Sequence, residues 1–383
     1  MGLLRECIEI WRFLFGTPKS AKAIVFYAEY EGSYPSFEGV IRELVENRRQ
    51  PITYITSDPT DSILTLNDPL IHTFCLKALL PSFMVLMNSK VVVLTLVGLN
   101  LHDIKRSVKD VSYVYVFHSI HSCNAVYEFG AFEHYDSVLC VGRHHVDELK
   151  KQEELYGFKK KALVEAGYYR IERIHEAYRK YAQAHSDSPK QKPTVLFAPS
   201  WEDNFVLENY AEQIVRALRD AEYEVVVRLH PESRRRFPEW IEAFAKKFVD
   251  DPGFRLEQLV TTDDSLFRAD VLITDWSGIA PEYAYGTERP VLFLDGVPKK
   301  INNDRFEELE IDPVEFSLRQ EIGVVLPVDA LDDAATYVGE ILTRREEFRE
   351  RILESRAKNI FHFNESSAIG ASHILELIGE ETE

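Results

Sequence analysis

The sequence predicts an α/β protein of two successive domains, each built around a parallel β-sheet. Three observations indicate this class. Short, nearly continuous apolar runs alternate with helical patterns, which is typical of parallel strands covered on both faces. A polar segment with two prolines at residues 186–193 interrupts this alternation, which then restarts. A chain of 383 residues, 45% of them hydrophobic, also suits two cores better than one.

The first domain is predicted at residues 21–185, after an amphipathic helix within residues 1–20. A final helix at residues 171–184 closes the domain. Its strands are predicted at residues 23–28, 52–56, 91–96, 113–117, 137–141 and 163–166.

The second domain is predicted at residues 194–343. Two terminal helices in residues 344–383 are expected to pack back toward the first domain. Two such domains joined by one linker predict two lobes that face a central cleft. The strands of the second domain are predicted at residues 194–198, 223–229, 270–274, 291–294 and 323–326, and its helices at 205–221, 235–248 and 329–342.

Composition excludes several classes of protein. A net charge of −18 argues against a nucleic-acid binder, which needs a basic surface to displace counterions. The four cysteines are widely spaced and form no C-x-x-C pair, so we expect neither a zinc site nor a disulfide framework. Charged residues interrupt the N-terminal apolar run, and no run is long enough to span a bilayer. We expect a cytoplasmic protein.

The N-terminal helix carries an apolar stripe. Two interpretations remain open: a helix packed on its own domain, or an interfacial helix that lies on a membrane or a subunit contact. The stripe consists of Leu3, Leu4, Cys7, Ile8, Trp11, Leu14 and Phe15.

Residues 271–295 indicate a ligand site. A buried strand ends at Asp275, a turn follows through Ser277 and Gly278, a helix begins near Glu282, and a second apolar strand returns. Ligands of open α/β sheets bind at the carboxyl ends of the strands, where a helix N-terminus attracts phosphate. We therefore expect a nucleotide diphosphate at this edge.

Two other strands of the second domain also end in polar residues. Ser200 and Trp201 follow the strand at 194–198, and His230 follows Arg228 at the end of the strand at 223–229. Because the carboxyl ends of parallel strands share one edge, these residues should meet Thr274 and Asp275. Pro231 stops its strand, so the His230 imidazole should project from the edge.

In the first domain, a buried strand at residues 113–117 runs directly into His118. Two histidines can divide a transfer reaction, one acting as base and the other donating to the leaving phosphate. We interpret His121, His144 and His145 as surface or packing residues. No carboxylates stand at ligand spacing near His118 and His121, so we expect no metal.

Together these segments resemble the CDP-glycerol glycerophosphotransferase family of teichoic-acid and capsule synthesis. Residues 199–201 (Pro-Ser-Trp), 229–231 (Leu-His-Pro) and 274–278 (Thr-Asp-Trp-Ser-Gly) are similar to its Pro-Thr-Trp, Leu-His-Pro and Thr-Asp-Tyr-Ser-Ser motifs. His118 stands where the histidine of the family's Trp-His-Gly-Thr motif falls. The resemblance covers residues 110–300. It implies a GT-B-like fold of two Rossmann-like domains, with the acceptor at the first and the nucleotide donor at the second.

The resemblance implies that His118 is the base on the acceptor hydroxyl and that His230 contacts the donor phosphates. The CDP-linked donor is a substrate, and no cofactor is implied. The acceptor is a surface glycan or a lipid-linked glycan, which suggests a place on the inner face of the membrane and a purpose for residues 3–15. The remaining donor-binding candidates are Arg228, Ser200, Trp201, Thr274, Asp275, Ser277, Gly278 and Glu282, with Arg234 as a phosphate contact.

Two departures from the family pattern leave alternatives open. Ser119 and Ile120 replace Gly-Thr after the histidine, and Gly278 replaces the second serine. One alternative is a GT-B glycosyltransferase that uses a CMP- or UDP-linked sugar, and another is an inactive nucleotide-binding scaffold. A nucleotide-sugar epimerase, which needs no acceptor, is a further alternative.

Overall fold

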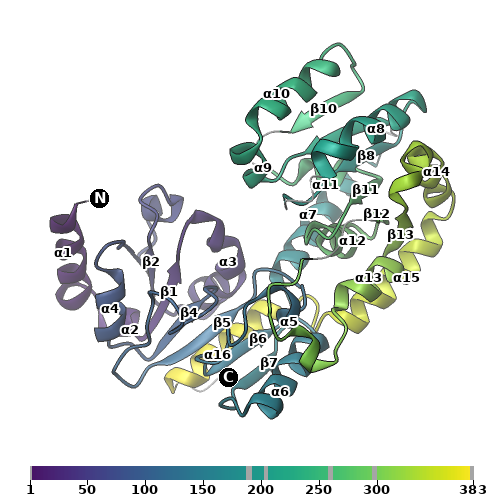
Figure 1. Cartoon of the computed structure of the whole chain (residues 1–383). Coiled ribbons are helices and arrows are strands. Elements are labelled where there is room, and N and C mark those ends of the chain that lie inside the picture. Colours follow the sequence, from purple (N-terminus) through teal and green to yellow (C-terminus); the bar gives the residue numbers. More distant parts are fainter. Residues whose placement is uncertain (1, 187–191, 202–205, 258–261, 296–299, 380–383) are drawn as a thin grey trace. The chain divides into compact units, whose positions relative to one another are not determined.

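A computed structural model describes residues 2–186, 192–201, 206–257, 262–295 and 300–379. The chain forms two compact units (Figure 1). The first unit combines Met1–Arg170, Ile301–Ile311 and Asn359–Glu383, and the second combines Ile171–Lys300 and Asp312–Lys358. Each unit is a parallel α/β sheet covered by helices, as the sequence predicts.

The first unit holds a seven-stranded sheet in the order β3-β2-β1-β4-β5-β6-β7, with every pair of neighbours parallel. Its strands are β1 (Ile24–Ala28), β2 (Ile52–Thr56), β3 (Ile71–Cys75), β4 (Val91–Leu94), β5 (Ser112–Val116), β6 (Ser137–Cys140) and β7 (Ala162–Glu165). Its longer helices are α1 (Leu3–Trp11), α3 (Tyr34–Arg42), α4 (Leu80–Leu86), α6 (Arg143–Tyr156) and α16 (Ser366–Ile378). Shorter helical segments are η1 (Arg12–Gly16), α2 (Lys19–Ala23), η2 (Glu31–Ser33), η3 (Glu43–Asn47), η4 (Ser62–Thr65), α5 (Cys123–Val126) and η5 (Phe306–Leu309).

The second unit holds a six-stranded parallel sheet in the order β10-β9-β8-β11-β12-β13. Its strands are β8 (Thr194–Phe197), β9 (Glu224–Arg228), β10 (Phe254–Glu257), β11 (Val271–Thr274), β12 (Val291–Leu294) and β13 (Gly323–Leu326). Its helices are α7 (Tyr169–Ala184), whose first residues belong to the first unit, α8 (Val206–Asp220), α9 (Pro231–Arg236), α10 (Pro238–Lys247), α11 (Asp264–Arg268), α12 (Ile279–Thr287), α13 (Val314–Glu321), η6 (Val328–Asp333), α14 (Ala334–Thr343) and α15 (Arg345–Asn359).

The strands form where the sequence places continuous apolar residues. Every residue of β1, β4, β8, β11 and β12 is buried, as expected for parallel strands with helices on both faces. The core of the first unit packs Phe26 and Tyr54 of the sheet against Phe37 of α3 and Ile374 of α16. Burial of so many large side chains supplies the main driving force for folding.

Three elements differ from the sequence prediction. The strands β3 and β10 were not predicted, and both lie at a sheet edge. The helix predicted at residues 235–248 is two helices, α9 and α10, because the chain leaves helical geometry at Phe237, directly before Pro238.

The units also divide the chain differently from the predicted domains. Helix α7 belongs mostly to the second unit, where His175 contacts the Gly286 carbonyl at 3.1 Å. Of the two terminal helices, α15 belongs to the second unit and only α16 belongs to the first, against α3. The middle of the predicted linker, residues 187–191, lies outside the described residues.

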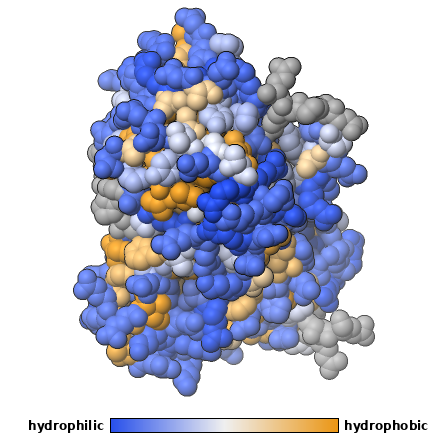
Figure 2. Space-filling view, turned by 90° about the vertical axis from the view of Figure 1, so that its right-hand side faces the viewer, coloured by the Kyte–Doolittle hydropathy of each residue, from blue (hydrophilic) through white to orange (hydrophobic). Residues whose placement is uncertain are grey.

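A downstream segment, residues 301–311, also belongs to the first unit. Asn302 donates to the carbonyls of Ala125 and Val126, at 2.9 and 2.7 Å, and Asn303 donates to the Asn124 side chain at 2.8 Å. Figure 2 looks onto the side where α14 and α15 lie in Figure 1, and this face shows mostly hydrophilic residues with smaller hydrophobic areas. Within the described ranges no helix combines the length and hydropathy needed to cross a bilayer.

Candidate active site

The three polar strand ends of the second unit meet because their strands are consecutive in the sheet. The order β9-β8-β11 places His230, Ser200 and Asp275 at one carboxyl edge. The Asp275 carboxylate, only 1% exposed, accepts from the Ser200 N–H at 2.9 Å and from its hydroxyl at 2.5 Å. The Thr274 hydroxyl donates to the Ala198 carbonyl at 2.6 Å. The first and third motifs therefore form one hydrogen-bonded cluster.

His230 joins this cluster through an aromatic contact. Its ring lies 5.9 Å from the Trp201 ring, centroid to centroid. Its Nδ1 accepts from the Glu232 N–H at 3.1 Å, which caps α9 and leaves the neutral ring's proton on Nε2. Burial lowers the pKa of His230. A neutral imidazole with an Nε2–H suits a donor to a phosphate oxygen.

The turn from β11 into α12 holds the remaining predicted donor residues. The Ser277 hydroxyl accepts from the Ile279 N–H at 3.5 Å, and Glu282 lies buried in the first turn of α12. Gly278 has an ordinary helical φ of −60°, so its backbone does not require glycine.

The arginines are placed differently from one another. Arg228 is buried and its guanidinium donates to the Ser265 hydroxyl at 3.0 Å and pairs with Asp263 at 3.7 Å. Arg234 is exposed and lines a surface groove with residues of α10. Arg236, which the sequence did not single out, lies over the Trp201 ring at 4.5 Å. Among the three consecutive arginines, Arg236 therefore contacts the motif cluster.

A second arginine was also missed. Arg319 of α13 is buried and lies over the Trp276 ring at 4.1 Å, while it donates to the Leu294 carbonyl at 2.6 Å. Burial lowers the pKa of Arg319, and the carboxylates of Asp295 and Asp275 oppose that effect. The charged guanidinium of Arg319 therefore holds the ring of Trp276, the aromatic residue of the third motif, through a cation–π contact.

His118 lies in the first unit, directly after β5 and Phe117. Its Nδ1 is 3.1 Å from the Thr95 hydroxyl, and its Nε2 is 3.4 Å from the Tyr127 hydroxyl. The surrounding protein lowers the pKa of His118 to about 4, and His121 adds to this effect. The His118 side chain itself is exposed, and water opposes this shift, but a lowered pKa keeps the ring mostly neutral at pH 7. A neutral ring is the form that a base requires.

The loop that carries His118 is held by other side chains. The Tyr168 hydroxyl donates to the His118 carbonyl at 2.8 Å. Ring nitrogens of His144 and His145 lie 2.9 Å from the carbonyls of Ile120 and His121. His145 also stacks on Phe117. The prediction that His144 and His145 are packing residues is confirmed.

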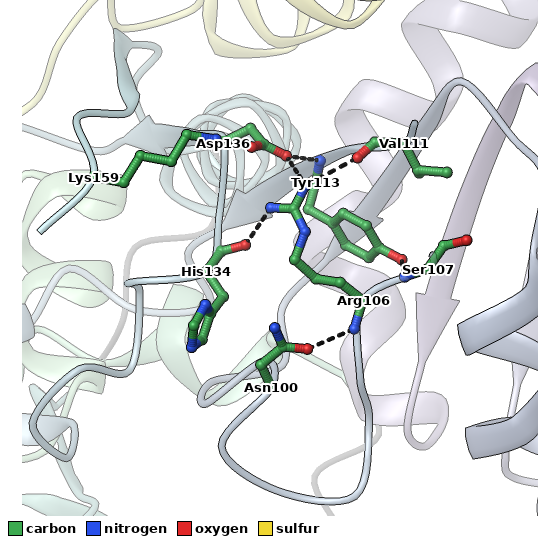
Figure 3. A network of polar contacts seen from close by, with 8 residues as sticks. All are labelled: Asn100, Arg106, Ser107, Val111, Tyr113, His134, Asp136 and Lys159. Carbon is green, nitrogen blue, oxygen red and sulfur yellow. Dashed lines mark hydrogen bonds and ion pairs between the residues drawn. The ribbon is translucent and has the colours of Figure 1, made fainter. Parts of the chain in front are cut away.

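The loop that carries Thr95 is fastened by a polar network (Figure 3). Arg106 donates to the His134 carbonyl at 2.6 Å and pairs with Asp136 at 2.7 Å. Lys159 reaches the other Asp136 oxygen at 2.8 Å, and the Tyr113 N–H donates to Asp136 at 2.9 Å. Residues 95–111 are thus tied to β5 and β6.

Within the described part of the chain, no group of three or more histidine, cysteine, aspartate or glutamate residues is arranged to hold a metal ion. All four cysteines are free thiols, and three of them are buried.

Two parallel α/β units, one of them with a polar cluster at a strand edge, form a GT-B-like fold. The chain belongs to the CDP-glycerol:poly(glycerophosphate) glycerophosphotransferase family, whose model matches residues 15–296. It is therefore a glycerophosphotransferase-type enzyme of surface-glycan synthesis. The predicted fold class and the family resemblance are confirmed.

Solved structures of low identity share the fold. The wall teichoic acid polymerase TagF, determined with CDPG, has a TM-score of 0.62 at 15% identity and covers 98% of this chain and 94% of its own. The S. aureus MnaA–UDP structure has a TM-score of 0.57 at 13% identity, over 94% and 99%. A Methanocaldococcus jannaschii UDP-GlcNAc 2-epimerase with UDP-GlcNAc and UDP has a TM-score of 0.58 at 13% identity, over 92% and 99%. No curated protein matches the chain.

Proposed function

We propose that this protein transfers glycerol phosphate, or a related alditol phosphate, from a CDP-activated donor to a hydroxyl of a surface-glycan or lipid-linked acceptor. The observation that carries this proposal is the cluster in which Ser200 bonds Asp275 and Trp201 contacts His230. These residues lie at the edge where α/β sheets bind phosphorylated ligands. The family supplies the reaction class.

The reaction follows from the chemistry of the two histidines. The acceptor oxygen attacks the β-phosphorus while its proton passes to His118. The bond between the β-phosphorus and the bridging oxygen breaks, and CMP leaves with that oxygen. His230, with its proton on Nε2, donates to a phosphate oxygen and offsets the developing charge. No metal or other cofactor takes part in this scheme.

The remaining donor-side residues fit this scheme in different ways. Asp275, Thr274 and Ser200 hold the shape of the site, and Ser277, Gly278 and Glu282 lie at the start of α12, where backbone N–H groups attract phosphate. Arg236 supplies positive charge beside Trp201 and is a second candidate phosphate contact next to Arg234. Arg228 supports the site through Ser265.

Thermal unfolding with nucleotides and a transfer assay test this function together. CDP and a CDP-alditol should raise the melting temperature more than CMP, UDP or GDP, because a ligand of the folded state alone stabilises it. His118→Ala and His230→Ala should each lower turnover by about 10²- to 10⁴-fold. His185→Ala, an exposed histidine of the second unit, is the matched control and should keep full turnover.

The assay also distinguishes the alternatives. A glycosidic product, or selective stabilisation by CMP or UDP, would replace this proposal with a sugar transferase. Epimerised nucleotide sugar formed without an acceptor would replace it with an epimerase. If no nucleotide raises the melting temperature and no turnover is detected, the proposal would be replaced by an inactive scaffold.

We also propose that the protein works on the cytoplasmic face of the membrane and contacts it through residues 3–15. Helix α1 is anchored by Glu6, whose buried carboxylate accepts from the N–H groups of Lys77, Ala78 and Leu79 at 2.8–3.2 Å. Phe13 packs edge-on against Phe74 and Phe83. With that face fixed, the apolar side chains left exposed are Leu3, Leu4, Ile8, Trp11, Leu14 and Phe15.

A flotation assay tests this contact. The full chain should float with vesicles that contain anionic lipid, because Arg5 and Lys19 stand exposed beside the stripe. Replacing Leu4, Trp11 and Phe15 together with serine should abolish flotation while the melting temperature stays within about 2 °C, since these side chains are solvent-exposed. Equal flotation by this variant would rule the contact out.

A further inference from the structure

The imidazole of His118 contacts a hydroxyl at each ring nitrogen, and the two contacts are unequal. Thr95 lies 3.1 Å from Nδ1, and Tyr127 lies 3.4 Å from Nε2, near the limit for a hydrogen bond. The Tyr127 ring stands edge-on to the imidazole, with centroids 5.8 Å apart. The shorter contact identifies Nδ1 as the fixed nitrogen and Nε2 as the one that can exchange its partner.

A general base of this kind needs one definite tautomer. It must carry its proton on one nitrogen and present the lone pair of the other to the hydroxyl that it deprotonates. If Nδ1–H donates to the Thr95 hydroxyl oxygen, the lone pair of Nε2 is free to accept from Tyr127 or from an acceptor hydroxyl. The hydrogen bond between Nδ1 and Thr95 also fixes the rotation of the ring.

Thr95 is held rigidly enough in the first unit to fix the orientation of the His118 ring. It follows β4, the immediate neighbour of β5, so the sheet sets its distance from His118. Directly after it, the Leu96 carbonyl accepts from the Tyr135 hydroxyl, and the Gly98 N–H donates to the Ala131 carbonyl at 3.0 Å. The Arg106 network of Figure 3 fastens the end of the same loop.

We propose that Thr95 is a positioning residue that holds His118 with its proton on Nδ1 and its Nε2 directed to the acceptor hydroxyl. Tyr127 occupies Nε2 until the acceptor hydroxyl replaces it. This inference rests on the proposed function, because it assigns an orientation to the base of that reaction. Titratable groups beside His118 include His121 and Tyr127, and the Tyr168 hydroxyl bonds the His118 carbonyl.

The kinetic test uses Thr95→Val, which keeps the shape of the side chain and removes the hydroxyl. We expect kcat to fall about 10- to 100-fold, a part of the contribution that a general base makes. The donor KM should stay unchanged, and Thr95→Ser should restore kcat to within about threefold. The acid limb of kcat/KM should move to lower pH, because the imidazolium loses a hydrogen-bond acceptor. Thr65→Val, which removes another hydroxyl of the first unit, is the matched control.

A second readout needs no turnover. ¹⁵N NMR of histidine-labelled full-length protein, with His118→Gln to assign the signals, reports which ring nitrogen carries the proton. The wild-type protein should show the Nδ1–H tautomer, and Thr95→Val should shift it toward a mixture. A wild-type Nε2–H tautomer, or an unchanged tautomer and kcat in Thr95→Val, would overturn the inference. A tautomer change in a protein that shows no transfer with any donor would uphold the positioning role and reject the proposed function.

Discussion

Asp275 links the strand ends of the second unit because a single carboxylate accepts from two donors of Ser200. The sequence predicted this meeting, since the residues follow parallel strands. The contacts of Thr95 with His118, of Arg236 with Trp201 and of Arg319 with Trp276 were not predicted. Each joins residues far apart in sequence, and a threonine or arginine alone carries no local signal of its partner.

Asp275→Asn should weaken both the fold and the donor site. The amide keeps one acceptor oxygen for the Ser200 N–H but places an NH₂ group opposite the Ser200 hydroxyl, so the charge-assisted bond from that hydroxyl is lost. We expect the free energy of unfolding to fall by about 1–3 kcal/mol, measured by urea denaturation, and stabilisation by CDP to be reduced. Asp332→Asn is the control, because Asp332 is exposed and accepts a hydrogen bond from Gln213 at the surface. An unchanged urea midpoint in Asp275→Asn would contradict this account.

At the scale of elements, most strands that the sequence predicted are buried on both faces, and the edge strands β7 and β13 were predicted as well. Continuous apolar runs in the sequence predict strands such as β1 and β11. The edge strands β3 and β10 were not predicted because polar residues interrupt their apolar runs: β3 contains the half-buried His72 and Thr73, and β10 contains Arg255 and Glu257. The break between α9 and α10 follows from Pro238. The periodic apolar pattern continues across this proline and therefore predicted one helix.

The loop at residues 95–111 should lose stability in acid through Asp136. Burial alone would raise the pKa of Asp136, but Arg106, Lys159 and the Tyr113 N–H outweigh it and lower the pKa below its usual value. The stabilisation is therefore complete above the unfolded-state pKa of about 3.9 and is lost as pH falls through the lower folded value.

Asp136→Asn should reduce the free energy of unfolding by about 1–3 kcal/mol at pH 7. The difference from wild type should shrink below about pH 4, because the carboxylate of the unfolded wild-type chain takes up a proton there and that of the folded protein does so at lower pH. Urea denaturation at pH 7 and pH 3 measures both values. Asp147→Asn breaks an exposed ion pair with Arg143 and should change stability by less than about 0.5 kcal/mol at either pH. A difference that persists undiminished at pH 3 would refute this linkage.

At the scale of the whole molecule, two units exchange segments of chain. Residues 301–311 and α16 belong to the first unit although the second unit separates them from it in sequence. The apolar face of α16, with Ile374 and Leu375, completes the core beside α3. The sequence analysis predicted that both terminal helices return to the first unit, and this was wrong for α15. The sequence does not separate the two, because α15 and α16 are both helical patterns of similar length.

The sequence by itself determined the class of fold, the positions of most buried strands along the chain and the three motifs at the strand ends of the second unit. These features depend on local patterns: apolar runs, proline stops and polar residues that follow a strand. Only the tertiary structure decided which residues orient the two histidines, which arginine contacts the donor motifs and where one unit ends. Those outcomes depend on contacts between distant segments, and such contacts are fixed when the sheets and helices pack.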